Sequence, residues 1–281
     1  MKLLRVGRSG REKPAILDDS GTVRDLSNII SDWSGAHLSD ESLQSIQRLD
    51  LATLPALSKD ERIGPCVAQI GKFICIGLNY ADHAAETGAE VPDEPVIFNK
   101  WTSAVCGPND PIIKPKNSTK LDWEVELGVV IGKTARYVST AQATKHIAGY
   151  CVINDVSERN FQLERGGQWD KGKGCDSFGP IGPWLVTRDA VADINNLGIW
   201  LEVNGKRYQD GNTRTMIFKV DEIVSYLSQF MSLQPGDVIS TGTPPGVGLG
   251  LNPPVYLEPD DVVRLGIEGL GEQQQTVINP W

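Results

Sequence analysis

Apolar and polar residues alternate over short stretches in most of this chain, which is the pattern of half-buried β-strands. Strand-like runs include FICIG at 73–77 and PVIFNK at 95–100, while DWEVELGVVIG at 122–132 alternates first and then becomes continuously apolar. The pair Asn204-Gly205, inside IWLEVNGKRYQ, predicts a two-residue hairpin turn. Because helices do not alternate regularly with these strands, we predict a β-rich α+β fold, mostly antiparallel or mixed, with a few covering helices.

Two segments have the spacing of amphipathic helices. SDESLQSIQRL at 39–49 begins with a capping serine and repeats apolar residues every three or four positions. In DEIVSYLSQFM at 221–231, the predicted apolar face comprises Ile223, Val224, Leu227, Phe230 and Met231. The first helix belongs to an opening segment that ends in a polar, proline-containing linker at 55–65. We therefore predict a small N-terminal α+β domain at 1–65 and a catalytic domain at 66–281.

Composition and charge restrict the partners that we expect. The chain has 281 residues, of which 40% are hydrophobic and 22% charged, as in an ordinary globular protein. A net charge of -9 disfavours both the phosphates of nucleic acids and anionic lipid, so we expect neither nucleic acid nor a membrane as partner. The five cysteines are scattered without a C-x-x-C pair, and no apolar run reaches about 18 residues. We therefore expect reduced thiols and a cytoplasmic location.

The candidate chemistry begins with three acidic residues. In an extended strand Asp122, Glu124 and Glu126 share one face, and the apolar residues that follow direct this strand into a core. Buried bare carboxylates are costly, so protonation, ion pairing or a metal is required. Asp155 ends the apolar run YCVIND and offers a third carboxylate to the two of Glu124 and Glu126. Such oxygen ligands suit Mg²⁺ or Mn²⁺ better than zinc or copper, whereas a solvated strand face is the alternative interpretation.

A polar segment, NYADHAAETGAEVPDE, contains His83 with Glu86 three residues later. On a helical turn the two side chains are neighbours, and a carboxylate beside an imidazole favours a general base that activates water. A surface salt link is the alternative. The composition of the segment is also typical of a lid over a substrate. Lys173 lies between glycines and could neutralise a substrate oxyanion, or could be an ordinary turn lysine.

The glycine-rich run STGTPPGVGLG at 240–250 offers threonine hydroxyls and backbone amides that suit a carboxylate. Prolines interrupt it and no helix-like pattern follows, so it does not predict a dinucleotide site. Neither a P-loop motif nor a G-x-S-x-G motif occurs in the chain. Nucleotide-binding loops and serine-elbow hydrolases are therefore not supported.

Taken together, the motifs resemble those of the fumarylacetoacetate hydrolase family over about residues 70–281. The motifs are ICIGLNYADHAAE, PVIFNKWTSA, DWEVELGVVIG, INDVSERNFQ, KGKGCDSFGP, VNGKRYQDGNTRTMIF and PGDVISTGTPPGVG. The likeness is closest to the bacterial branch of acylpyruvate and 2,4-diketo-3-deoxy-sugar-acid hydrolases. It implies a mixed β-roll core, a small N-terminal domain and a homodimer.

The resemblance also implies roles for individual residues. Glu124, Glu126 and Asp155 would bind Mg²⁺ (or Mn²⁺). The catalytic residues would be His83 and Glu86, as a water-activating pair, with Lys173. The substrate-binding residues would be Gln162, Thr243, Arg159 and Tyr80.

The activity that we expect is metal-dependent hydrolysis of a carbon–carbon bond in a small anionic 2-oxo acid, specifically a 2,4-dioxo acid, with release of pyruvate. Other reactions on the same scaffold remain open: ureidoglycolate lyase, oxaloacetate decarboxylase, and 2-hydroxy-dienoate isomerase or hydratase activities. A metal-stabilised binding protein without catalytic activity is the alternative from another class.

Overall fold

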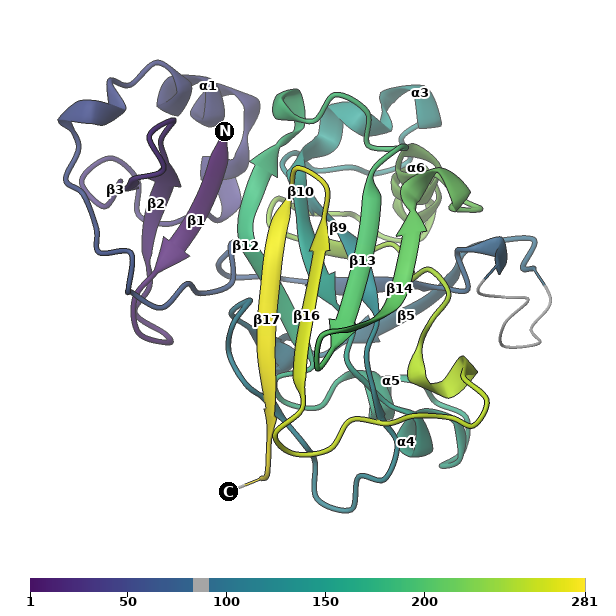
Figure 1. The fold of residues 1–281 in the computed structure, drawn as a ribbon. Helices are drawn as coiled ribbons and strands as arrows, with labels where there is room; N and C mark the ends of the chain where they lie inside the picture. Colours follow the sequence, from purple (N-terminus) through teal and green to yellow (C-terminus); the bar gives the residue numbers. More distant parts are fainter. Residues whose placement is uncertain (83–90, 281) are drawn as a thin grey trace.

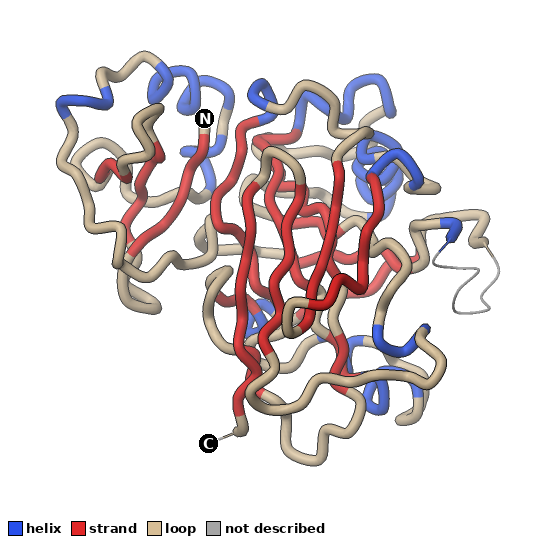
Figure 2. The backbone as a smooth tube through the Cα atoms, in the orientation of Figure 1, coloured by secondary structure: helices blue, strands red, loops and turns tan. Residues whose placement is uncertain are grey.

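Strands dominate the molecule, and most of them belong to two large sheets (Figures 1 and 2). The computed structural model describes residues 1–82 and 91–280. The first sheet has ten strands, in the order β3 (Val23–Asp25), β2 (Lys13–Leu17), β1 (Lys2–Val6), β12 (Gly179–Thr187), β10 (Ile147–Asn154), β9 (Val125–Ile131), β15 (Val238–Ser240), β4 (Phe73–Gly77) and β5 (Val96–Lys100), with β6 (Val105–Cys106) paired to β12.

The second sheet has five strands, in the order β14 (Lys206–Asn212), β13 (Gly198–Val203), β16 (Val262–Ile267), β17 (Gly271–Ile278) and β7 (Ile112–Ile113). A separate pair joins β8 (Leu121–Asp122) to β11 (Ser157–Glu158). The α-helices that lie wholly within the described residues are α1 (Asp40–Gln47), α3 (Thr140–Ala143), α4 (Arg159–Leu163), α5 (Asp170–Lys173) and α6 (Val220–Phe230). The prediction of a strand-rich fold that contains both helices and strands is therefore confirmed.

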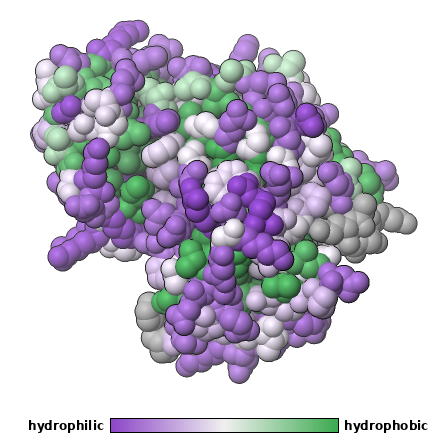
Figure 3. Space-filling view, in the orientation of Figure 1, coloured by the Kyte–Doolittle hydropathy of each residue, from purple (hydrophilic) through white to green (hydrophobic). Residues whose placement is uncertain are grey.

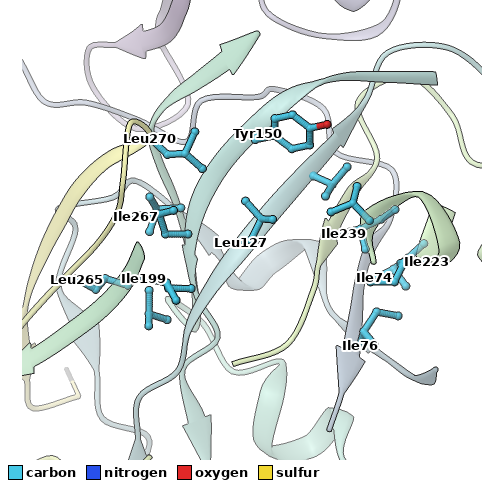
Figure 4. Packing of buried hydrophobic residues seen from close by; sticks show 14 of the residues in the cluster. Ile74, Ile76, Leu127, Tyr150, Ile199, Ile223, Ile239, Leu265, Ile267 and Leu270 are labelled. Atoms are coloured by element: carbon cyan, nitrogen blue, oxygen red, sulfur yellow. The ribbon is translucent and has the colours of Figure 1, made fainter. Parts of the chain in front are cut away.

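The main core lies between the two sheets. Side chains of β9 alternate, so Leu127 and Val129 pack in one apolar cluster together with Ile199 and Leu265 of the second sheet (Figure 4). Val130 points to the opposite face and belongs to a second cluster. Because both faces of β9 are covered, its sequence is continuously apolar after the first residues.

The opening segment covers that opposite face. Its strand β1 pairs antiparallel with β12, and its helix α1 lies on the same side in Figure 1. Trp33 of this segment shares the second cluster with Val130 and Cys151 of the main sheet. The segment therefore continues the sheet and buries one of its faces. The domain boundary at residue 65 and the β-roll description stay predictions.

Several predicted elements are confirmed. The hairpin turn has left-handed backbone at Asn204, with φ of 51°, and at Gly205, with φ of 78°. Ser39 caps α1, because its Oγ accepts a hydrogen bond from the amide of Ser42. The prediction for Phe230 is wrong: this last residue of α6 is 63% exposed, whereas Ile223, Val224 and Leu227 of the same face are buried.

Polar residues cover most of the face drawn in Figure 3, with apolar residues visible between them. Within residues 1–82 and 91–280, no helix is both long and apolar enough to cross a bilayer.

Candidate metal centre and active site

Three carboxylates meet where β9 and β10 run antiparallel to each other. Glu126 lies in β9, opposite Ile153 of β10, and the amide of Asp155 donates to the carbonyl of Glu124 over 2.8 Å. One ligand oxygen from each of Glu124, Glu126 and Asp155 lies within 4.8 Å of the others. Their exposed fractions are 5%, 2% and 0%. A solvated strand face is therefore excluded for these residues.

The strand that carries them differs from the predicted one. Asp122 belongs to β8, while Trp123 and Glu124 lie outside any strand and β9 begins at Val125. Trp123 and Val125 both pack in the main core, as the alternation predicts. Asp122, however, does not join the group of three carboxylates.

Three cations surround the acidic group. Lys173 Nζ lies 2.6 Å from Glu124 Oε2 and 2.8 Å from Asp155 Oδ2. Arg159 Nη2 lies 2.6 Å from Glu124 Oε1. Lys100 Nζ lies 2.5 Å from Asp155 Oδ1. Burial alone would lower the pKa of Lys173, but the charges of Asp155 and Glu124 outweigh it and raise this pKa. Lys173 therefore stays protonated at neutral pH.

Asp122 orients Arg159 from the other side. Its Oδ2 accepts from Arg159 Nε over 2.8 Å, and its two oxygens also accept from the amides of Gly248 and Leu249. The charges of Asp122 and Glu124 raise the pKa of Arg159 against the opposing effect of burial. Arg159 is thus a fixed cation that also donates to Gln162 Oε1 over 3.1 Å.

The partners of Glu126 differ from those of the other carboxylates. Within the described part of the chain it has no ion pair, and its Oε2 accepts only from Ser240 Oγ at 2.6 Å and from the amide of Gly242 at 2.9 Å. Burial raises the pKa of Glu126 well above its ordinary value, and the nearby charges of Asp155 and Glu124 raise it further. A cation between these residues would remove this cost.

The donor set fits a divalent metal. Asp155 Oδ1 is fully buried yet accepts no hydrogen bond from any described residue, because the Lys100 contact has ion-pair distance without hydrogen-bond geometry. Glu126 likewise has spare acceptor capacity and no cationic neighbour within bonding distance among the described residues. Carboxylate oxygens in this arrangement are the ligands that Mg²⁺ and Mn²⁺ prefer. Glu124, Glu126 and Asp155 would hold such an ion.

A cavity of about 250 Å³ opens beside the acidic group. Glu124, Glu126, Arg159, Gln162, Lys173 and Thr243 line it together, so the structure brings most of the predicted residues to one site. Thr243 Oγ1 is engaged, since it donates to the carbonyl of Val125 over 2.8 Å and accepts from Gln209 Nε2 over 2.7 Å.

Tight backbone packing positions the helices that carry these residues. Helices α4 and α5 lie side by side in Figure 1. At Gly172 of α5, a Cβ atom would lie 2.4 Å from the carbonyl oxygen of Glu158, which precedes α4. Only glycine allows this approach, which places Lys173 and Gln162 on the same cavity. The glycine before Lys173 thus allows the backbone of α5 to approach the residue that precedes α4.

Not every predicted residue lines the cavity. Tyr80 is fully buried in the main core and is not among the lining residues, so its substrate contact stays a prediction. His83 and Glu86 lie outside the described residues. Lys100 received no role from the sequence, and Asp122 was predicted only to share a strand face with Glu124 and Glu126. The sequence did contain a signal for Lys100. It ends the alternating strand PVIFNK and lies on the same face as Phe98, so the alternation places its side chain among buried residues.

A β-rich fold with a buried acidic centre beside a small cavity defines the class of candidate metal-dependent enzymes. The family described as fumarylacetoacetate (FAA) hydrolase, C-terminal, matches residues 72–278. The chain therefore belongs to the fumarylacetoacetate hydrolase family, and the resemblance seen in its motifs is confirmed.

Individual relatives agree with this assignment. A Burkholderia ambifaria protein named "Putative hydrolase" is 64% identical over 280 residues, which are 99% of each chain. The structure of 2-hydroxyhepta-2,4-diene-1,7-dioate isomerase from Mycobacterium marinum is 34% identical, with a TM-score of 0.75 over 99% of this chain and 98% of that one. Maleylpyruvate hydrolase from Sphingobium sp. SYK-6, in complex with manganese(II) and pyruvate, is 27% identical, with a TM-score of 0.83 over 100% of both chains.

Proposed function

We propose that the chain is a Mg²⁺- or Mn²⁺-dependent hydrolase that cleaves a carbon–carbon bond in a small 2,4-dioxo acid and releases pyruvate. The observation that carries this proposal is the convergence of Glu124, Glu126 and Asp155 beside a cavity of about 250 Å³. A family neighbour that binds both manganese(II) and pyruvate supports it. So does the hydrolase name of the close Burkholderia relative.

The charge balance of the site supports an anionic substrate. Four buried carboxylates, Asp122, Glu124, Glu126 and Asp155, are set against three buried cations, Lys100, Arg159 and Lys173. When all are ionised, four negative and three positive charges leave one negative charge. A divalent cation would change this to one positive charge, which attracts a carboxylate.

The residues of the chain would then bind and orient the substrate. Lys173 is a protonated donor on the cavity wall, and Gln162 offers an amide held by Arg159. When bound, the divalent cation supplies electrostatic stabilisation for the negative charge that develops on the 2-oxo oxygen as the C3–C4 bond breaks. The proposal that His83, oriented by Glu86, takes a proton from the attacking water rests on the sequence motif alone.

The direct test is a substrate screen of the purified chain. Acylpyruvates, 2,4-diketo-3-deoxy sugar acids and oxaloacetate are each incubated with MgCl₂, with MnCl₂ and with EDTA, and pyruvate is measured with a coupled dehydrogenase. We expect pyruvate from at least one 2,4-dioxo acid, loss of activity in EDTA and recovery when metal is returned. Metal-dependent release from oxaloacetate alone would instead assign a decarboxylase.

A second candidate is isomerisation of a 2-hydroxy-dienoate, which the Mycobacterium marinum neighbour favours because it is named for such an activity. The two reactions are easily separated. An isomerase shifts the ultraviolet absorbance of the dienoate without forming pyruvate, whereas the proposed hydrolase forms pyruvate in step with the loss of the dioxo acid.

A further inference from the structure

The residues that line the cavity beside the acidic centre are of two chemical kinds. The charged ones are Glu124, Glu126, Arg159 and Lys173. Six others have large apolar side chains, and we call them the apolar wall: Ile76, Leu78, Phe98, Leu163, Trp169 and Leu249. If the 2-oxo acid end of a substrate lies at the carboxylates, the apolar wall is the largest group of side chains left to contact the rest of the molecule.

Close packing fixes the aromatic part of the wall. The rings of Trp169 and Phe98 meet edge to face, with centroids 5.4 Å apart. The indole also lies directly on Gly77 at the end of β4, where a Cβ atom would be 2.6 Å from Trp169 Cζ3. The indole is therefore held in one place on the cavity wall.

Backbone strain marks the next residue of the wall. Leu78 has a φ of 53°, in the left-handed region that a leucine rarely adopts. The following residue fixes this turn: Asn79 Nδ2 donates to the carbonyls of Phe218 and Thr241, and Asn79 Oδ1 accepts from the amide of Phe218. The fold thus keeps an apolar side chain on the cavity wall at a position where glycine would be less strained.

The described lining residues offer no free cation to a second anionic group. Arg159 and Lys173 are the only cations among them, and both are paired with buried carboxylates. The nearby Arg165 donates to Asn160 Oδ1 and does not line the cavity. A carboxylate placed at the apolar wall would lose its hydration without gaining a partner there.

Building on the proposed function, we propose that the apolar wall makes the enzyme selective for 2,4-dioxo acids whose distal substituent is an alkyl or aryl group. Substrates that end in a second carboxylate or in several hydroxyls are disfavoured. The volume of about 250 Å³ lies just below the range of about 300–1,000 Å³ for drug-sized ligands, so the substituent is small.

The test measures binding, so it does not depend on hydrolysis. Isothermal titration calorimetry with MgCl₂ present compares 2-oxohexanoate with 2-oxoadipate, which has the same number of carbons but ends in a carboxylate. We expect 2-oxohexanoate to bind at least about tenfold more tightly, because the second carboxylate has no partner on the wall. Equal or tighter binding of 2-oxoadipate, or no binding of either acid, would overturn the inference.

A charge placed on the wall should change this preference. Leu163 is 46% exposed, so Leu163→Lys adds an ammonium group at the rim without burying it. We expect the ratio of the two affinities to shift toward 2-oxoadipate by about tenfold. The matched control is Ile29→Lys, at a residue that is 42% exposed and not in the cavity, and it should leave the ratio unchanged.

The outcomes separate the two proposals. A shifted ratio in Leu163→Lys alone supports the selective wall, whereas an unchanged ratio, or an equal shift in Ile29→Lys, contradicts it. If 2-oxohexanoate is preferred but no 2,4-dioxo acid yields pyruvate, the hydrolase proposal fails and the apolar selectivity stands.

Discussion

Glu126→Gln removes one negative charge from the acidic centre while keeping the shape of the side chain. An amide oxygen at this position can still accept from Ser240 Oγ and from the amide of Gly242, as Glu126 Oε2 does. Glu126 has no ion pair with a described cation, so the variant leaves no buried cation unpaired. The metal-free protein should therefore be at least as stable as the wild type, since a buried charge is costly.

The size of the expected change in Tm follows from the free energy of metal binding. At a metal concentration about 100 times the Kd, binding stabilises the folded state by about 2.7 kcal/mol. With an unfolding entropy of about 2.1 cal/mol/K per residue, 281 residues convert this into a rise in Tm of about 5 °C. We expect this rise in the wild type and not in Glu126→Gln. We also expect turnover to fall by about 10²–10³-fold, the loss typical when one group that stabilises developing charge is removed.

The assay is thermal unfolding with EDTA and with MnCl₂, together with pyruvate release at saturating metal. The control is Glu258→Gln, which makes the same chemical change in a side chain that is 64% exposed and paired with Lys114. It should keep both the metal-induced rise in Tm and the turnover.

Two results would refute this reasoning. One is a Glu126→Gln protein that still gains about 5 °C with MnCl₂ and turns over normally, because the metal would then lie elsewhere. The other is a large loss of metal-free stability in the variant, which would indicate a structural role for the Glu126 charge. Glu124→Ala is a weaker test, since it also strips Arg159 and Lys173 of a buried partner.

Three further outcomes are expected. Lys100→Met removes one cationic partner of buried Asp155. Urea unfolding should therefore show a loss of about 3–5 kcal/mol in the free energy of unfolding. A loss below about 1 kcal/mol would contradict the ion pair. Gly172→Ala should cost about 1–3 kcal/mol in the same assay and lower turnover, because its Cβ would be 2.4 Å from the carbonyl of Glu158. The control Gly198→Ala, whose Cβ would meet nothing nearer than 3.6 Å, should cost less. If the proposed homodimer forms, light scattering should give twice the chain mass of 30.6 kDa, and a single-chain mass would contradict it.

The local features of the site could be predicted from the sequence. Glu124 and Glu126 stood next to an apolar run that only a buried strand explains, and Asp155 ended another such run. The Asn204-Gly205 turn could be predicted equally well, because left-handed backbone at two successive positions strongly restricts the residue types. In both cases the residues that determine the feature lie within a few positions of it in the sequence.

Features that depend on distant segments could not be predicted. The pairing of β1 with β12 joins residues that lie more than 180 positions apart, such as Lys2 and Val186. Lys100 acquires its role only because β5 brings it beside Asp155. Phe230 has the helical spacing of a buried residue, yet it is exposed, because burial depends on which other segments pack against the end of the helix.

The most direct measurement is the location of bound metal. Crystals soaked with MnCl₂ and pyruvate should show one strong anomalous peak between the carboxylate oxygens of Glu124, Glu126 and Asp155, with the 2-oxo acid beside it. A map in which these oxygens enclose no anomalous scatterer, while manganese is bound elsewhere or not at all, would contradict the metal centre on which the proposed hydrolysis depends.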